Sequence, residues 1–224
     1  ELGIYSVAMS LAGVATIIAG IFNTIWAPLV YKWVSTGDID FQKIDRISEY
    51  VLAAIYFTVV GSGLLSWIVP YFLPHEYERV QILLTLCLIG PLLYTLSETT
   101  AIGIAITRKT KFSMYASICA MIVGILGNYL LIPILGASGA AISLAVSFGI
   151  FYIIRTEFSR IVWRKMAVGK SYWVIFGLLI IAIQNALLSH DFITRYSIWF
   201  FALIIGFYIF RKTISECLKK IRCF

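Results

Sequence analysis

Charged residues are scarce in this chain. Asp, Glu, Lys and Arg together make up 13% of its 224 residues, whereas about a quarter is usual in a soluble domain. Hydrophobic residues account for 61%. One core cannot hide so much apolar surface from water. The composition therefore excludes a soluble domain and indicates a membrane protein.

Cysteine and histidine are also rare, with four and two residues. His75 and His190 are predicted to lie in loops without a cysteine or a second histidine nearby, so we expect no metal site. No cysteine spacing matches a metal-binding motif, and we expect free thiols. The sequence also lacks a Gly-rich phosphate loop, a Ser/His/Asp arrangement and an HExxH motif. These absences predict that the protein is not an enzyme and uses no cofactor.

We expect no signal peptide, because no charged segment with a cleavage site precedes the first apolar run. The first residue, Glu1, is not an initiator methionine. We therefore expect the chain to begin inside a longer protein.

Long apolar runs fill most of the chain and predict an all-α membrane bundle of seven transmembrane helices. The fifth and seventh runs are short for a span, but aromatic and basic flanks can extend them to the interface. The seven runs are Ile4 to Val30, Tyr50 to Val69, Val80 to Ile106, Met114 to Leu131, Ala140 to Ile154, Tyr172 to Leu188 and Tyr196 to Phe210.

The basic residues alternate between the predicted loops. The first, third and fifth loops and the C-terminal tail hold 16 of the 18 Lys and Arg residues, with Arg155 counted in the fifth loop. Because cytoplasmic loops carry an excess of basic residues, the N-terminus is predicted outside and the C-terminus inside. The net charge of +7 follows from this asymmetry. It indicates anionic lipid headgroups as partners and not nucleic acid.

Small residues recur in two rows where the fourth and fifth runs meet. The turn between the runs contains Pro133, which is predicted to end the first helix, and glycines that permit a tight reversal. Small side chains let membrane helices approach closely, so an antiparallel pair is predicted. The rows are Gly139, Ser143 and Ser147, and Ala141, Ala145 and Gly149. A similar row in the first run, Ala8, Ala12, Thr16, Gly20 and Thr24, is read as a packing seam or as one wall of a polar cavity.

The third run is chemically unusual. Pro91 interrupts its middle and is predicted to kink the helix. Glu98 follows among hydroxyl residues, ten residues before Arg108, and it is the only acid assigned to a span. A carboxylate inside a membrane costs a few kcal/mol unless it is paired, protonated or hydrated. Glu98 is therefore a candidate for ion coupling or substrate contact, and the alternative is a neutral, hydrogen-bonded packing residue.

Two amides complete the candidate transport pathway. Asn23 lies near the predicted mid-membrane level of the first span, and Asn128 lies in the fourth. No basic residue is assigned to any span, so Glu98 is expected to have no partner charge within the chain. The first loop carries an N-terminal helix signal at residues 35–38 and a short amphipathic segment after it. This segment is predicted to be an interfacial helix.

The segment from Asn128 to Ala141 can be written N-x-x-L-I-P-x-x-G-A-x-G-A-A. In this pattern the chain resembles the polysaccharide-exporter family of lipid-linked oligosaccharide flippases, including O-antigen flippases. Supporting segments are Leu2 to Ala8, Trp26 to Pro28 and Gly103 to Thr110. The similar segments are scattered over most of residues 1 to 155.

The resemblance implies the architecture of a multidrug/oligosaccharidyl-lipid/polysaccharide exporter, which has two six-helix lobes and an extra helix pair in the polysaccharide branch. The chain is then similar to the C-terminal half, and the N-terminal lobe is missing. Residues 1–155 form five spans of that lobe, 156–171 a cytoplasmic linker, 172–211 the extra pair of helices and 212–224 a basic cytoplasmic tail.

The implied function is alternating-access transport of a polyprenyl-pyrophosphate-linked oligosaccharide across the bacterial cytoplasmic membrane, for O-antigen or capsule synthesis. Other polysaccharide-assembly proteins are implied as further partners. With no basic residue assigned to a span, pyrophosphate contact is expected from Arg108, Lys109 and Lys111 at the cytoplasmic mouth, or from the missing lobe. The plain alternative for these three residues is positive-inside topology. Alternative functions are a drug or cation antiporter of the same superfamily, and then a membrane glycosyltransferase or polymerase.

Overall fold

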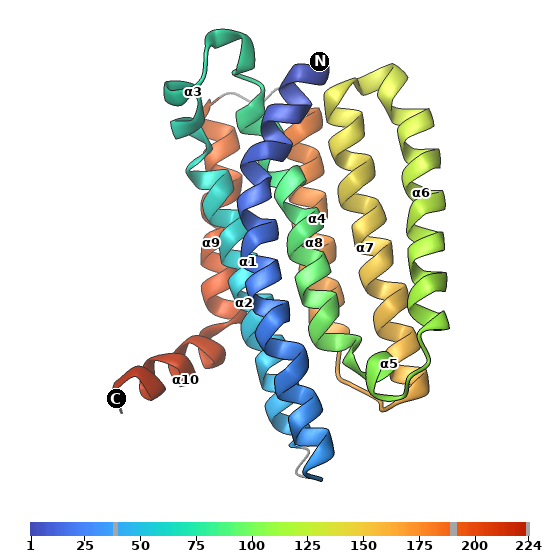
Figure 1. The fold of residues 1–224 in the computed structure, drawn as a ribbon. Coiled ribbons are helices and arrows are strands. Elements are labelled where there is room, and N and C mark those ends of the chain that lie inside the picture. Colours follow the sequence, from blue (N-terminus) through green and yellow to red (C-terminus); the bar gives the residue numbers. More distant parts are fainter. Residues whose placement is uncertain (38–39, 189–191, 223–224) are drawn as a thin grey trace.

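The protein is a bundle of long helices that run roughly parallel or antiparallel to one another (Figure 1). The computed structural model describes the chain except residues 38–39, 189–191 and 223–224. The helices are α1 (Leu2–Ser35), α2 (Phe41–Leu64), α3 (Val69–Phe72), α4 (Val80–Thr100), α5 (Ile102–Ile106), α6 (Lys111–Leu135), α7 (Ala137–Val162), α8 (Gly169–Leu187), α9 (Phe192–Ile209) and α10 (Arg211–Arg222), with short 3₁₀ turns at Ser66–Ile68 and His75–Tyr77. The described residues contain no strand, so the all-α prediction is confirmed.

Six helices of the described chain are long and apolar enough to cross a membrane: α1, α2, α4, α6, α7 and α8. A seventh span results if α9 and α10, which are bent by 67° at a short break, are counted together. Each of the seven predicted runs overlaps one of the long helices α1, α2, α4, α6, α7, α8 and α9. A multi-pass membrane bundle accounts for the hydrophobic composition, because apolar side chains can cover the outside of such a protein as well as its core.

Helix α4 is the centre of the bundle and packs against α1, α2, α7 and α8. Most of its residues are buried, including Leu86 and Leu96. Pro91 lies inside α4, which continues past it to Thr100, and the helix is interrupted only at Ala101, before α5. The third predicted run is thus two helices. After Pro91, the Thr95 hydroxyl donates a hydrogen bond of 2.9 Å to the Pro91 carbonyl one turn earlier.

Helices α6 and α7 form the predicted antiparallel hairpin (Figure 1). Ser143 donates a hydrogen bond of 3.0 Å to the Gly124 carbonyl of α6, and a Cβ on Gly127 would overlap Ser143. The predicted small-residue seam is therefore confirmed here. Pro133 does not end α6, which continues to Leu135 before Gly136 reverses the chain with φ +57°.

The row of small residues in α1 follows the packing seam only at its beginning. Ala8 and Ala12 are buried, but Thr16, Gly20 and Thr24 are exposed. The buried positions continue instead at Ala15, Ala19, Trp26 and Val30. A helix has 3.6 residues per turn, so a row spaced by four residues rotates away from a straight contact.

The predicted interfacial helix of the first loop is not a separate element. Its residues form the beginning of α2, which runs without a break from Phe41 to Leu64. The Asp40 side chain caps this helix by accepting a hydrogen bond of 3.1 Å from the Lys43 N–H. Asp38, part of the predicted start signal, lies outside the described residues. Asp40 supplies the cap because it directly precedes the first helical turn.

Helix α9 is held to α2 by aromatic side chains that pack on glycines. Trp199 of α9 is completely buried where it contacts Gly63, and Tyr56 of α2 contacts Gly206. The Tyr56 hydroxyl donates a hydrogen bond of 2.6 Å to the Ala202 carbonyl. Each glycine leaves room for a ring on the neighbouring helix, and so the two helices interlock.

We expect Gly63→Ala to destabilise the protein by about 1–3 kcal/mol, the usual cost of overpacking. The added Cβ would lie inside the Trp199 indole, and a ring cannot move aside as a flexible side chain can. Gly61→Ala is the matched control, because no described atom lies within 4 Å of a Cβ there. Thermal unfolding of the detergent-purified protein checks this, and equal unfolding temperatures for the two variants would contradict the interlock.

Candidate functional site

An ion pair joins two helices inside the bundle. Arg155 Nη1 of α7 lies 2.6 Å from Glu98 Oε1 in the last turn of α4. The same nitrogen donates to Ser97 Oγ over 2.9 Å. The side chains are 14% and 21% exposed for Arg155 and Glu98, so water screens the pair far less than it screens a surface pair.

The Glu98 turn is also fixed from the opposite side. Trp26 of α1, a buried residue, donates from its indole N–H to the Glu98 carbonyl over 3.2 Å. Ser48 of α2 donates to Thr99 Oγ1 over 2.6 Å. Three helices therefore set the position of the carboxylate. A charge held in this way has a defined orientation toward its partner, as a coupling site requires.

Two aromatic rings separate the ion pair from a groove. Tyr94 and Phe151 are stacked with centroids 6.0 Å apart and an angle of 10°. The Arg155 guanidinium carbon lies 5.9 Å from the first ring centroid and 5.4 Å from the second. Such contacts favour a cation electrostatically. Both rings also line the groove, so the guanidinium lies directly behind part of its wall.

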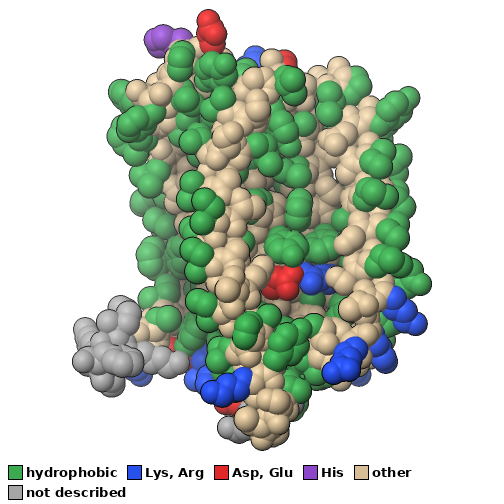
Figure 2. All heavy atoms as spheres, in the orientation of Figure 1, with side chains coloured by type: hydrophobic (Ala, Val, Ile, Leu, Met, Phe, Trp, Pro, Cys, Tyr) green, Lys and Arg blue, Asp and Glu red, His purple; other side chains and the backbone are tan. Residues whose placement is uncertain are grey.

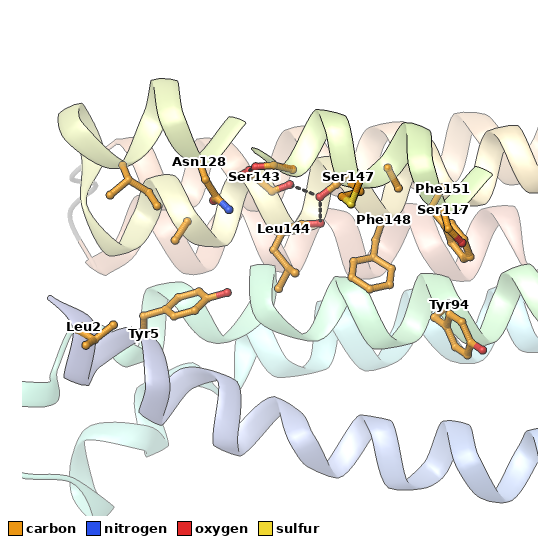
Figure 3. Close-up of a pocket in the computed structure, with 15 residues that line it drawn as sticks. Leu2, Tyr5, Tyr94, Ser117, Asn128, Ser143, Leu144, Ser147, Phe148 and Phe151 are labelled. Carbon is orange, nitrogen blue, oxygen red and sulfur yellow. Dashed lines mark hydrogen bonds between the residues drawn. The ribbon is translucent and has the colours of Figure 1, made fainter. Parts of the chain in front are cut away.

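The groove has a volume of about 630 Å³ and runs between α1 and α4 on one side and the α6–α7 hairpin on the other. Figure 3 shows Asn128, Ser143 and Ser147 on the hairpin side and Tyr5 on the α1 side. Its lining is mostly apolar with a few amide and hydroxyl groups. That composition is typical of sites for amphipathic molecules. Figure 2 shows acidic and basic atoms side by side in a recess of this face, surrounded by hydrophobic side chains.

The expectation that Glu98 has no partner charge within the chain is wrong. The fifth apolar run was taken to end at Ile154, but α7 continues to Val162 and includes Arg155. Glu98 therefore has a partner charge within the chain. The extended helix also contains Thr156 and Ser159, which are completely buried, and it reaches into the segment predicted as the linker. In this last part of α7, the helix packs against its neighbours through buried polar side chains and not through apolar ones.

The amides predicted for the pathway lie in different surroundings. Asn128 lines the groove. Asn23 does not line it. Its Oδ1 is buried and has no hydrogen-bond partner among the described residues, and it lies one turn before Trp26 on α1. The structure thus brings Asn128 to the groove, while Asn23 lies near the helix turn that holds Glu98 from the α1 side.

The predicted cytoplasmic-mouth residues Arg108, Lys109 and Lys111 are exposed around the α5–α6 connection. None of them lines the groove. The Lys111 ammonium lies 5.5 Å from the Phe112 ring centroid. Arg108 has a φ of +54°, an uncommon backbone conformation outside glycine and asparagine. The cation that the structure places behind the groove wall is instead Arg155.

Metal-ligating side chains are not clustered in the described part of the chain. No group of three or more His, Cys, Asp or Glu side chains is arranged to hold a metal ion within that part. His190 lies outside the described residues, as does Cys223, whereas Cys87, Cys119 and Cys217 are free thiols.

Comparison with models of known protein families, with curated protein sequences and with solved structures finds no match to this chain.

Proposed function

We propose that the chain is part of a membrane transporter that moves a polyprenyl-pyrophosphate-linked oligosaccharide across the bacterial cytoplasmic membrane, for surface polysaccharide synthesis. The observation that carries the proposal is the Arg155–Glu98 pair behind the wall of the groove. Ionisable residues inside membrane spans are costly and usually mark substrate or ion pathways. The resemblance of Asn128 to Ala141 to lipid-linked oligosaccharide flippases gives the substrate class.

Arg155 suits an anionic substrate for a geometric reason. Its Nη1 is occupied by Glu98 and Ser97, but its Nε is buried without a hydrogen-bond partner among the described residues. Guanidinium groups bind phosphate in a bidentate manner, which uses two N–H groups together. A pyrophosphate oxygen that reaches Arg155 gains a donor that the protein leaves unused. If the substrate replaces Glu98 as the partner of Arg155, anion binding is linked to the charge state of Glu98.

The proposal includes the membrane orientation and the missing half. With the N-terminus outside and the C-terminus in the cytoplasm, the α5–α6 and α7–α8 connections face the cytoplasm. The groove then faces the N-terminal lobe. In alternating access, the two lobes close the groove first toward one side of the membrane and then toward the other. Labelling of a Gly169→Cys variant by an impermeant thiol reagent in sealed cells would contradict this orientation.

The test of the function is transport by the full-length protein in vesicles. We expect movement of a fluorescent polyprenyl-pyrophosphate-linked sugar across the bilayer and no uptake of cationic dyes. Vesicles without protein and vesicles with the heat-inactivated protein are the controls. Failure to move the lipid-linked sugar while the protein is folded and correctly inserted would refute the proposal.

A drug or cation antiporter is the second candidate, and Glu98 favours it. A carboxylate near an apolar groove is suited to a lipophilic cation, provided that Arg155 releases it. The same vesicles distinguish the two functions: dye transport without movement of the lipid-linked sugar supports the antiporter.

A further inference from the structure

Helix α10 leaves the bundle at an angle. It follows α9 after a short break, with a bend of 67° between them. In Figure 1 it points away from the other helices at the end of the bundle where the loop between α7 and α8 also lies. An amphipathic helix at such an angle to the bundle can lie along the membrane surface.

The sequence of α10 is strongly two-sided. Apolar residues stand at positions 214, 217, 218 and 221, the spacing of one helical face, and basic residues at positions 211, 212, 219, 220 and 222. Among the side chains that the structure describes, Arg211, Lys212 and Lys219 are exposed. An apolar face with basic residues around it is the pattern of helices that lie in the headgroup region of a bilayer.

Contacts with α2 fix how α10 is rotated. Thr213 donates to Glu49 Oε1 over 3.1 Å, and Glu216 accepts from Tyr50 over 3.3 Å and lies 3.8 Å from Arg46 Nε. Glu49 is also paired with Lys170 of α8. Positions 213 and 216 lie roughly a third of a turn from the apolar positions. The protein therefore contacts one side of α10, and on the apolar side Ile214 is half-buried against the bundle while Cys217 is exposed.

We infer that α10 is a docking surface for anionic phospholipid headgroups. Its apolar face enters the bilayer surface while its basic residues attract the headgroups. A helix is about 10 Å across, so every basic position lies within about one Debye length of the headgroup plane at physiological salt. Each Lys or Arg near an anionic surface adds to the attraction. Among the described side chains, the contacts with α2 are made by Thr213 and Glu216 in the first half of α10, and in the proposal the lipid holds the second half.

The test uses the full chain with a fluorophore on Cys217, an exposed residue of α10. Cys119 and Cys223 are replaced by alanine, and the buried Cys87 remains. The protein is reconstituted in phosphatidylcholine vesicles or in an equal mixture with phosphatidylglycerol. Quenching by acrylamide, which is uncharged, reports exposure to water. We expect clear protection in the anionic vesicles, which high salt removes.

The variant Arg211→Gln/Lys219→Gln should lower the ratio of lipid-bound to released α10 by about 30-fold, since each basic residue contributes about five- to sixfold. Lys32→Gln/Lys165→Gln is the matched control: it removes the same charge from two exposed residues outside α10 and should keep the protection. Amide hydrogen exchange of unlabelled α10 in the same vesicles provides a second measurement.

Three results would overturn the inference. These are equal quenching and exchange in the two vesicle types, protection that persists in the α10 variant, and an equal loss in the control variant. The last result would mean that the net charge of the protein, and not α10, responds to the lipid.

Discussion

Replacing Arg155 by alanine is expected to lower the stability of the protein by roughly 3 kcal/mol, because Glu98 would remain largely buried without its partner. For a chain of this size the unfolding temperature should fall by roughly 6 to 12 °C. The loss combines the unpaired carboxylate, the lost bond to Ser97 and the lost packing of the guanidinium on Tyr94 and Phe151. Thermal unfolding of this chain in detergent measures it.

Two further variants separate these causes. Arg155→Ala/Glu98→Ala should recover part of the loss, since it leaves no unpaired charge. Arg160→Ala, also on α7, removes an ion pair with Glu157 whose side chains are 29% and 40% exposed. A more exposed pair is worth about 1 kcal/mol or less. If Arg155→Ala and Arg160→Ala unfolded at the same temperature, the Glu98 pair would be an ordinary surface interaction.

The variant Glu98→Gln should lose transport or transport without coupling, although it still inserts into the membrane. Glycan export is normalised to the abundance of the protein in the membrane. Glutamine keeps the shape and a hydrogen-bond acceptor for Arg155 but removes the charge and the titratable proton. If Glu98 binds a proton or a cation as it leaves Arg155, that step cannot occur in this variant. Glu98→Asp should retain part of the activity because it keeps the carboxylate.

The measurement is movement of lipid-linked glycan by the reconstituted full-length protein across a series of pH values. Glu157→Gln is the matched control, because Glu157 is likewise a paired acid that bonds Arg160 and Tyr172 over 2.6 Å each, but it lies on α7 and its partner is Arg160 and not Arg155. Wild-type activity of Glu98→Gln at every pH would remove Glu98 from the mechanism and leave it a structural partner of Arg155.

The fold could be predicted well from the sequence because one signal dominates it. Seven apolar runs give the number and order of the long helices, and small residues between Gly139 and Gly149 give the α6–α7 contact. Helix ends were less predictable, since an apolar run marks only the part of a helix that needs an apolar environment. Thus α7 extends eight residues beyond the predicted end at Ile154. Five of those eight residues are polar or charged, and two of the five, Thr156 and Ser159, are buried.

The candidate site was half predictable. Glu98 could be found as an acid within an apolar run, but Arg155 was counted as a loop residue because it directly follows the fifth run. Two signals pointed to it. An acid inside a membrane needs a partner, and Tyr152, Thr156 and Ser159 continue the helical spacing of α7 across Arg155. Glu98 and Arg155 pair because α4 packs against α7. The spacing of residues in the sequence does not show which helices are in contact.

The α6–α7 hairpin has a consequence for how the protein is assembled. Within α6 only Ala116 is buried, and the helix packs almost entirely on α7, its neighbour along the chain. The hairpin can therefore complete its close packing once both helices are in the bilayer, without waiting for α8 or α9 to be synthesised. Helix α4 reaches its full set of neighbours only when α8 is inserted. During biogenesis the Glu98 carboxylate thus precedes its partner Arg155 into the membrane, and the arrival of α7 neutralises it.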